Sequence, residues 1–240
     1  MSLHIYNTAE EMTQALASWI YGLFCDRLSK SSRFSFVLSG GNTPKSLYEL
    51  MAGGEYKAKI PWGRIDFFWG DERFVPFEDE RNNARMAFNT LLNHVPVPAD
   101  HIHRMKTEIP PEDAVNDYDS LLRKYLDLNH KKGFDLVLLG MGDDGHTLSL
   151  FPGTQIIHEN KAWVGEFYLK AQEMNRITLT KVLVNQSDYV AFMATGSGKA
   201  RALREVLKGK NQPDLYPSQV IHPVSGQLHW FIDKAAASSL

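Results

Sequence analysis

The stretch GFDLVLLGMGDDGHT (residues 133–147) joins an uninterrupted apolar run to a loop rich in glycine and acidic residues. A continuous apolar run of this length is typical of a strand that is buried on both faces inside a parallel sheet. The loop after it places an acid pair, Asp143 and Asp144, just before Gly145 and His146. The stretch therefore predicts a central strand whose carboxyl end leads directly into a candidate site.

The same order of strand, loop and helix recurs on both sides of this stretch. Short apolar runs predict further strands at residues 34–38, 65–69, 162–167, 176–180, 189–195 and 228–233. Helical spacing and start signals predict helices at residues 9–24, 43–51, 83–92, 112–128, 181–186 and 200–208. Thr8 is expected to cap the first of these helices, and Thr43 to cap the second, with Pro44 as its first helical residue.

Alternating strands and helices predict an α/β fold of the Rossmann-like kind, with a mostly parallel sheet and helices on both faces. A chain of 240 residues fits one large domain. We expect a single catalytic domain over residues 1–234. The small, polar tail at residues 235–240 is expected to fray.

The composition excludes several classes of protein. With 43% apolar and 22% charged residues, the chain is neither disordered nor collagen-like, and no apolar run reaches the length of a membrane span. A net charge of -2 gives no broad positive field, so we expect no binding of nucleic acid or membranes. One cysteine, Cys25, and a first segment unlike a signal peptide favour the cytoplasm. A monomer is expected.

Four loops follow predicted strands and should meet at one edge of the sheet. They are SGGNTP (39–44), GDERFVP (70–76), GMGDDGHT (140–147) and TGSGK (195–199). Ligands of such sheets bind beyond the carboxyl ends of the strands. The glycines, acids and cations of these loops are therefore expected to line a single site.

The first of these loops has the character of an anion site. Flexible backbone at a helix N-terminus, with hydroxyl groups nearby, attracts phosphate or carboxylate. The residues concerned are Ser39, Gly40, Gly41, Asn42 and Thr43. A tight turn with an ordinary cap is the alternative interpretation.

Two further loops supply cations and acids. Lys199 is expected to add a phosphate contact, and Arg73 to hold the substrate electrostatically, while Asp71 and Glu72 orient a partner or water. A surface cluster of salt bridges is the alternative for Asp71 to Arg73.

The strongest chemical signal is the pair of Asp144 and His146. An imidazole beside a carboxylate, in a loop that glycines allow to approach a ligand, suits a general base. Backbone N–H groups from Gly142 to Gly145 are candidates for holding an oxyanion.

Motifs for nucleotide binding, serine esterases and metal binding fit this sequence less well. Residues 140–145 match the dinucleotide fingerprint, with Glu166 at the expected distance, but Pro152-Gly153 interrupts the long helix that this motif requires. The spacings of a P-loop and of a nucleophile elbow are both absent. His101 and His103 lack a third ligand and are interpreted as structural, so no metal is expected.

Together, and in this order, these motifs resemble the 6-phosphogluconolactonase family, which is itself similar to the glucosamine-6-phosphate deaminases. The resemblance runs from about Phe34 to Ile232. It rests on SGGNTPKSLYELM, WGDERFVPFEDERNNARMAFNTLL, FDLVLLGMGDDGHTLSLFPGT, NRITLT and the Gly198–Lys199 turn. Deaminases typically have an aromatic residue after the Asp-Glu pair and Asn-Glu-Pro shortly after the Gly-His. This chain has Arg73 and TLSLFP at those places, which favours the lactonases.

The resemblance implies a fold of the deaminase and ribose-5-phosphate isomerase kind, a hydrolase of 6-phosphogluconolactone in the oxidative pentose phosphate pathway, and no metal or organic cofactor. It adds Arg176 to the phosphate contacts and Asn83 to the binding residues. The chain departs from the family at Asn42, where Ser or another polar residue is usual, at Asn82, where Ser is usual, and at Leu148, where Ala is common.

The expected mechanism has three roles. His146 is the base that activates water, Asp144 orients His146 or stabilises its charged form, and Arg73 contacts the substrate. Phosphate is expected on residues 40–43, with Lys199 and Arg176. One rival is a deaminase or isomerase of amino sugar phosphates. The other is a sugar-phosphate binding module without catalysis, which the retention of Asp144 and His146 disfavours.

Overall fold

The computed structural model describes all 240 residues. Its strands are β1 (Ser2–Tyr6), β2 (Phe34–Leu38), β3 (Ile65–Trp69), β4 (Asp71–Arg73), β5 (Ile102–His103), β6 (Leu136–Gly140), β7 (Val164–Leu169), β8 (Met174–Leu179), β9 (Tyr189–Ala194) and β10 (Gln227–Asp233). Its helices are α1 (Ala9–Leu28), α2 (Asn42–Ala52), α3 (Gly54–Lys59), α4 (Asn83–Ala87), α5 (Pro111–Leu128), α6 (Lys181–Val184) and α7 (Ala200–Lys208). A π-helical segment, Phe88–Leu92, continues α4.

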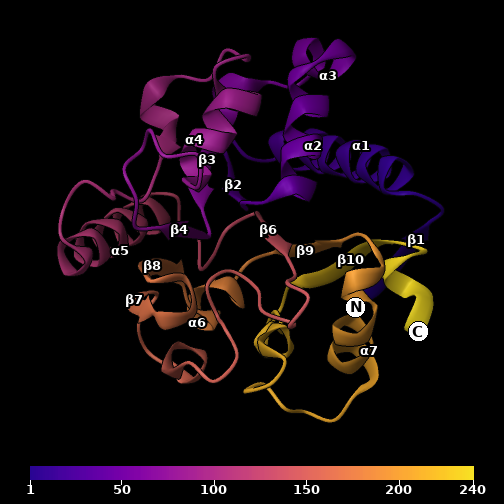
Figure 1. Ribbon diagram of the computed structural model, residues 1–240. Helices are drawn as coiled ribbons and strands as arrows, with labels where there is room; N and C mark the ends of the chain where they lie inside the picture. Colours follow the sequence, from indigo (N-terminus) through magenta and orange to yellow (C-terminus); the bar gives the residue numbers. More distant parts are fainter.

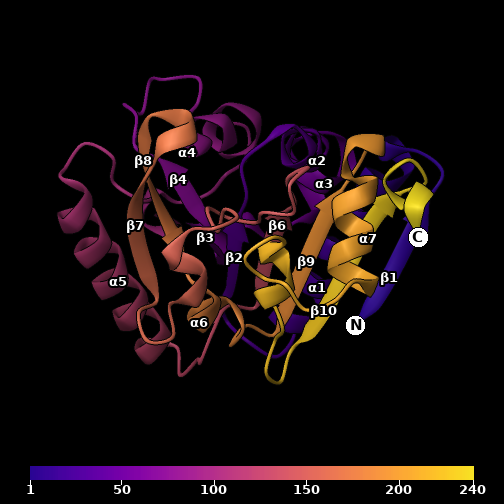
Figure 2. The same cartoon turned by 60° about the horizontal axis from the view of Figure 1, so that its bottom comes forward.

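Seven strands form one sheet in the order β1-β10-β9-β6-β2-β3-β5, and every neighbouring pair is parallel. The predicted α/β fold with a mostly parallel sheet is confirmed. From β2 the chain proceeds outward to β3, whereas from β6 it proceeds to β9 on the other side (Figure 2). The carboxyl ends of β2 and β6 therefore form the crevice at which such sheets bind ligands.

The central strands are buried on both faces because their side chains alternate between two apolar cores. In β2, Phe36 and Leu38 belong to one core and Val37 to the other. In β6, Leu138 lies in the first core and Leu139 in the second. Since successive side chains of a strand point to opposite faces, an unbroken apolar run serves both cores.

Helices cover both faces of this sheet. Figure 1 shows α1, α2 and α4 above it and α6 and α7 below it. The apolar side chains of α1, α2 and α4 contribute to the first core, and those of α5, α6 and α7 to the second.

A second, smaller sheet was not predicted. It has the order β4-β8-β7, with antiparallel pairing throughout. Gly70 connects the two sheets, because its N–H donates to the carbonyl of Leu38 and its carbonyl accepts from the N–H of Leu179. The expectation that Asp71–Arg73 lies in a loop was wrong, since these residues form β4 and pair with β8.

The start of α1 follows the prediction, and the start of α2 does not. The side chain of Thr8 caps α1 by accepting the N–H of Glu11. The N-cap of α2 is Gly41, whose φ of 106° is one that glycine adopts without strain. The helix therefore begins before Thr43, and the predicted Thr43 cap was wrong.

The chain ends beside the edge strand β1 (Figure 2). Ala236–Ser239 forms a 3-10 turn, and the Asp233 carboxylate accepts the N–H of Ala236. Fraying of residues 235–240 and a single catalytic domain over residues 1–234 stay predictions.

Candidate active site

A cleft of about 190 Å³ opens at the carboxyl ends of β2 and β6. Gly140, Met141 and Leu148 form part of its wall. The other residues that line it were all predicted for the site: Ser39, Gly40, Gly41, Asp71, Arg73, Asn83, Gly142, His146, Arg176 and Lys199. The four predicted loops therefore meet around one cleft.

The imidazole of His146 is held between a carboxylate and an aromatic ring. Its Nδ1 lies 2.6 Å from Oδ1 of Asp144, and its backbone N–H donates to the same oxygen. Phe151 stacks on the imidazole with 4.1 Å between ring centroids. Burial raises the pKa of the Asp144 carboxyl, but the hydrogen bonds from His146 outweigh it and leave that pKa below its usual range. Nε2 of His146 is the ring nitrogen without a protein partner.

The loop that carries His146 is closed by its own hydrogen bonds. The N–H of Gly142 donates to the carbonyl of His146 at 2.8 Å, and the N–H of Gly145 donates to the carbonyl of Gly142 at 3.0 Å. A Cβ on Gly142 would lie 2.1 Å from Nδ1 of His146, so only glycine fits there. Because the N–H groups of Gly142 and Gly145 are used within the loop, this arrangement does not support them as oxyanion donors. Gly145 and Asp144 do not line the cleft.

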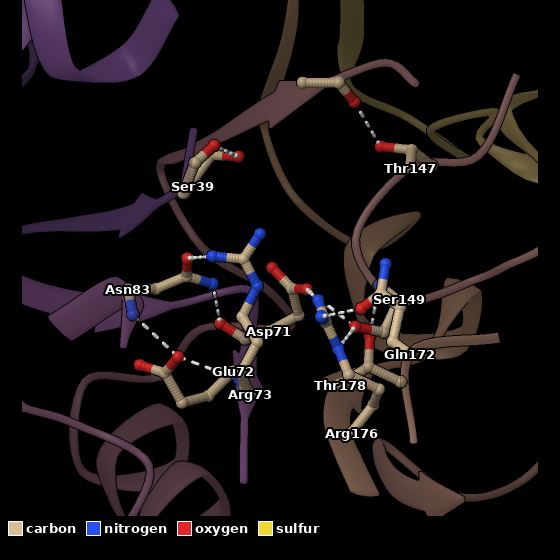
Figure 3. A network of polar contacts seen from close by, with 12 residues as sticks. Ser39, Asp71, Glu72, Arg73, Asn83, Thr147, Ser149, Gln172, Arg176 and Thr178 are labelled. Atoms are coloured by element: carbon tan, nitrogen blue, oxygen red, sulfur yellow. Dashed lines mark hydrogen bonds and ion pairs between the residues drawn. The ribbon is translucent and has the colours of Figure 1, made fainter. Parts of the chain in front are cut away.

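Arg73 is an anchored cation with free donors. Its Nη1 donates to Oδ1 of Asn83 at 2.8 Å and to the carbonyl of Arg81 at 2.9 Å, while its Nε and Nη2 have no protein partner (Figure 3). Nδ2 of Asn83 donates in turn to the carbonyl of Asp71. A Cβ on Gly40 would lie 1.9 Å from Oδ1 of Asn83, so glycine at position 40 makes room for the amide that holds Arg73.

Glu72 lies away from the cleft. Its carboxylate accepts the backbone N–H groups of Arg73, Asn83 and Ala84 at 2.7 to 2.8 Å and so holds the start of α4 (Figure 3). Burial raises the pKa of Glu72 to about 7, although these three N–H groups act in the opposite direction. The structure does not bring Glu72 to the substrate side predicted for it.

Asp71 and Arg176 form a buried ion pair in the wall of the cleft. Oδ2 of Asp71 accepts from Nη2 of Arg176 at 2.8 Å and from Oγ of Ser149 at 2.6 Å. Nε of Arg176 donates to the same Ser149 hydroxyl, and Nη1 donates to Gln172 (Figure 3). Burial lowers the pKa of the Arg176 guanidinium, and Asp71 opposes that change.

The two arginines share one face of the small sheet. Arg73 and Arg176 are direct cross-strand partners in β4 and β8, so their side chains project on the same side. Arg176 is paired with Asp71, but no carboxylate lies within ion-pair distance of Arg73. The wall of the cleft therefore carries one uncompensated positive charge, which favours an anionic ligand.

The loops after β2 and β9 are joined across the end of β6. Oγ1 of Thr43 lies 3.1 Å from Oγ1 of Thr195. The N–H groups of Gly41, Asn42 and Thr43 make no hydrogen bond within the protein. Asn42 and Thr43 do not line the cleft, and Lys199 pairs with Asp143 at 2.7 Å. Free N–H groups at the start of an 11-residue helix fit the predicted anion site.

No three His, Cys, Asp or Glu side chains come together in a way that could hold a metal ion. His101 and His103 contact the ion pair of Arg33 and Asp66 at the other end of β3. None of the helices has the length and apolar character needed to cross a bilayer.

Comparisons with known proteins identify the family of this chain. The family model for glucosamine-6-phosphate isomerases/6-phosphogluconolactonase matches residues 7–230. The chain belongs to this family. A probable 6-phosphogluconolactonase 3, chloroplastic, of Oryza sativa subsp. indica is 35% identical over 250 residues, covering 99% of this chain and 76% of the relative. A 6-phosphogluconolactonase of Synechocystis sp. is 36% identical over 219 residues, covering 89% of this chain and 87% of the relative.

The crystal structure of 6-phosphogluconolactonase from Thermotoga maritima superimposes with a TM-score of 0.85 and 29% identity, covering 97% of this chain and 99% of that one. The resemblance predicted from the sequence is therefore confirmed.

Three supporting residues of this family member were not predicted. Ser149 and Phe151 follow His146 by three and five residues, inside the TLSLFP stretch that separates lactonases from deaminases, so their signal was present. Gln172 lies in a turn before β8 and contacts Arg176. Nothing in its sequence surroundings marks it.

Proposed function

We propose that this chain is a hydrolase that converts 6-phosphogluconolactone to 6-phosphogluconate in the oxidative pentose phosphate pathway. The observation that carries the proposal is the His146–Asp144 pair at a cleft whose walls hold Arg73, Arg176 and Lys199. A base beside several cations suits an ester that carries a phosphate group. The lactonase names of relatives that match nearly the whole chain support the same substrate.

His146 is the base for the attacking water. Donation of Nδ1–H to Asp144 fixes the tautomer in which Nε2 carries the lone pair. Nε2 takes a proton from water as the water oxygen bonds to the lactone carbonyl carbon. The Asp144 carboxylate stabilises the imidazolium that this step forms.

Arg73 receives the developing oxyanion. Its free Nε and Nη2 donate to the carbonyl oxygen, while Asn83 and the Arg81 carbonyl keep the guanidinium in place. When the tetrahedral intermediate collapses, the bond between the carbonyl carbon and the ring oxygen breaks. His146 returns its proton to that oxygen, which becomes a hydroxyl. The new carboxylic acid then ionises and releases one proton.

The phosphate of the substrate binds at the start of α2. The unpartnered N–H groups of Gly41 to Thr43 and the helix dipole favour a dianion there. Lys199 and Arg176 contribute charge, and Arg73 lies closer to the sugar. This orientation places the lactone carbon near His146.

The test is a titration of the proton released by hydrolysis. Freshly prepared 6-phosphogluconolactone is added to the protein at constant pH, and the rate of base uptake is compared with spontaneous hydrolysis. A rate well above background that scales with protein concentration is expected. Ammonia release from glucosamine 6-phosphate without lactone hydrolysis would instead assign the deaminase reaction. Binding of 6-phosphogluconate with neither reaction would leave a binding module.

We also propose an oligomeric state, a compartment and a domain organisation for the protein. We expect a monomer in the cytoplasm, without nucleic-acid partners, in which residues 1–234 form one catalytic domain. The net charge of -2 supports the absence of nucleic acid. The rice relative is named as chloroplastic, so localisation by a fluorescent fusion is the direct test of compartment. Light scattering on a sizing column tests the monomer.

A further inference from the structure

We propose that Ser218, in the segment between α7 and β10, is a positioning residue for His146. The inference rests on the proposed role of His146 as the base. The carbonyl of Gly145, the residue just before His146, accepts two hydrogen bonds from Ser218, at 2.9 Å from its backbone N–H and at 2.8 Å from its Oγ. Ser218 is buried and does not line the cleft, so it acts on the loop and not on the substrate.

The His146 loop also packs tightly against Tyr216 on the side that faces Ser218. Gly145 has a φ of 80°, and a Cβ on it would lie 3.0 Å from Cδ1 of Tyr216 and 3.3 Å from Cα of Tyr216. The loop backbone therefore lies directly against the segment that carries Ser218. Glycine is required here both for its backbone conformation and for this close approach.

The segment also supports the turn that stacks on His146. Phe151, whose ring stacks on the imidazole, lies two residues before Gly153, and the N–H of Gly153 donates to the carbonyl of Asp214 at 3.0 Å. The carboxylate of Asp214 pairs with Nε2 of His158 at 2.7 Å. Both turns that fix the imidazole, before and after it in the chain, thus bond to one distant segment.

That segment is a firm support because it is fixed to α7. Nε2 of the buried Gln219 donates to the carbonyls of Glu205 and Lys210, both at 2.9 Å, and its Oε1 accepts the N–H of Gln212 at 2.7 Å. In Figure 1 the segment lies beside α7, below the sheet. The position of the His146 loop is therefore set by contacts more than 60 residues further along the chain.

Loss of the Ser218 hydroxyl should reduce turnover and spare substrate binding. In Ser218→Ala the carbonyl of Gly145 keeps one of its two hydrogen bonds, and the loop gains freedom to move. A small displacement of a catalytic group lowers the rate strongly, so we expect kcat to fall about 10-fold. KM should stay within about twofold, because Ser218 touches nothing in the cleft.

Ser187→Ala is the matched control. Ser187 is also buried, its Oγ accepts the N–H of Phe134 at 3.2 Å, and it lies at the amino-terminal end of β9, opposite the cleft. Lactone hydrolysis, the urea midpoint and amide hydrogen exchange of residues 142–147 are measured for both variants. We expect faster exchange in this loop and lower kcat in Ser218→Ala only.

Ser218→Ala with the kcat and loop exchange of the wild type overturns the inference, as does an equal loss of kcat in Ser187→Ala at equal stability. If the wild-type protein does not hydrolyse the lactone, the proposed function fails. Loop exchange still decides whether Ser218 holds the His146 loop, so the two failures are distinguishable.

Discussion

Two pairs of ionisable side chains at the cleft have nearly the same separation and different surroundings. Asp144 and His146 are 2.6 Å apart with side chains 48% and 29% exposed, whereas Asp71 and Arg176 are 2.8 Å apart with side chains 8% and 3% exposed. Removing one partner of a buried pair leaves an uncompensated charge in a medium that solvates it poorly. The exposed pair can exchange protons with water and with a bound substrate. The exposure of the side chains, and not the distance between them, separates the pair proposed to perform the chemistry from the pair that forms the wall of the cleft.

The largest effect on the exposed pair is expected from His146→Ala. Without the base, kcat should fall about 10² to 10⁴-fold, because that is the usual contribution of general base catalysis. The free energy of unfolding should fall by no more than about 1 kcal/mol, since the variant loses only the stacking on Phe151 and a partly exposed pair with Asp144. Proton release from the lactone and urea unfolding measure the two quantities. Wild-type turnover in this variant would remove His146 from the mechanism.

Removal of one partner of the buried pair is expected to lower the stability of the protein. Asp71→Ala leaves the Arg176 guanidinium without its carboxylate, which is expected to cost about 3 to 5 kcal/mol. Urea unfolding at neutral pH measures the loss. Asp143→Ala is the control, because Asp143 pairs with Lys199 at the exposed rim, where a salt bridge contributes less than about 1 kcal/mol. Similar losses in both variants would contradict the distinction between wall and rim.

A third pair, Arg33 and Asp66 at the amino-terminal end of β3, predicts how stability depends on pH. Asp66 is buried and accepts from Arg33 and Tyr125. Burial raises the pKa of Asp66, but the nearby His103 and the hydrogen bonds from Arg33 and Tyr125 outweigh it and lower the pKa to about 2. The contribution of Asp66 is therefore complete above pH 4 and lost as pH falls toward 2, a change of about 2 kcal/mol.

Urea midpoints between pH 5 and pH 2.5 test this dependence. Asp66→Asn should show a smaller decrease over that range than the wild-type protein. Parallel curves for the two proteins would mean that Asp66 titrates normally and that the buried pair contributes nothing to acid stability.

The smallest effect is expected at the rim, from Lys199→Ala. Loss of one partly exposed cation should raise KM for 6-phosphogluconolactone about 10-fold, since a charge-assisted hydrogen bond is worth about 1.5 kcal/mol. Gluconolactone without phosphate cannot use this contact, so its KM should stay nearly constant. An equal rise for both lactones would place Lys199 at the ring or reveal a folding defect.

The sequence was sufficient to predict the parallel sheet and the place of the cleft. Residues 136–139 are apolar at every position and residues 34–38 at every position except Ser35, and the loops after these strands must meet at one edge. The sequence was insufficient to show that the side chains of Asp71 and Glu72 face different parts of the protein. Once residues 71–73 form a strand, alternate side chains face opposite sides, so Asp71 and Arg73 reach the cleft and Glu72 reaches α4.

The partners of the buried pair were also out of reach of sequence reasoning. Ser149 lies 78 residues from Asp71 in the chain and donates directly to its carboxylate. The N–H of Ser149 also donates to Oγ1 of Thr178, the residue of β8 that pairs with Asp71 in β4. Short polar residues such as Ser149 and Gln172 have no local pattern that announces a distant contact. Their roles depend on a second sheet whose short strands give a weak signal.

The missing side chain of Gly40 links two positions 43 residues apart in the chain. The carboxamide of Asn83 occupies the space that a Cβ at position 40 would need, and the same carboxamide holds Arg73. A larger residue at position 40 is tolerable only if position 83 shrinks, and then the arginine loses its anchor. Substitutions at positions 40 and 83 are therefore coupled. We expect relatives under selection for the same reaction to keep both Gly40 and Asn83, or to change both together.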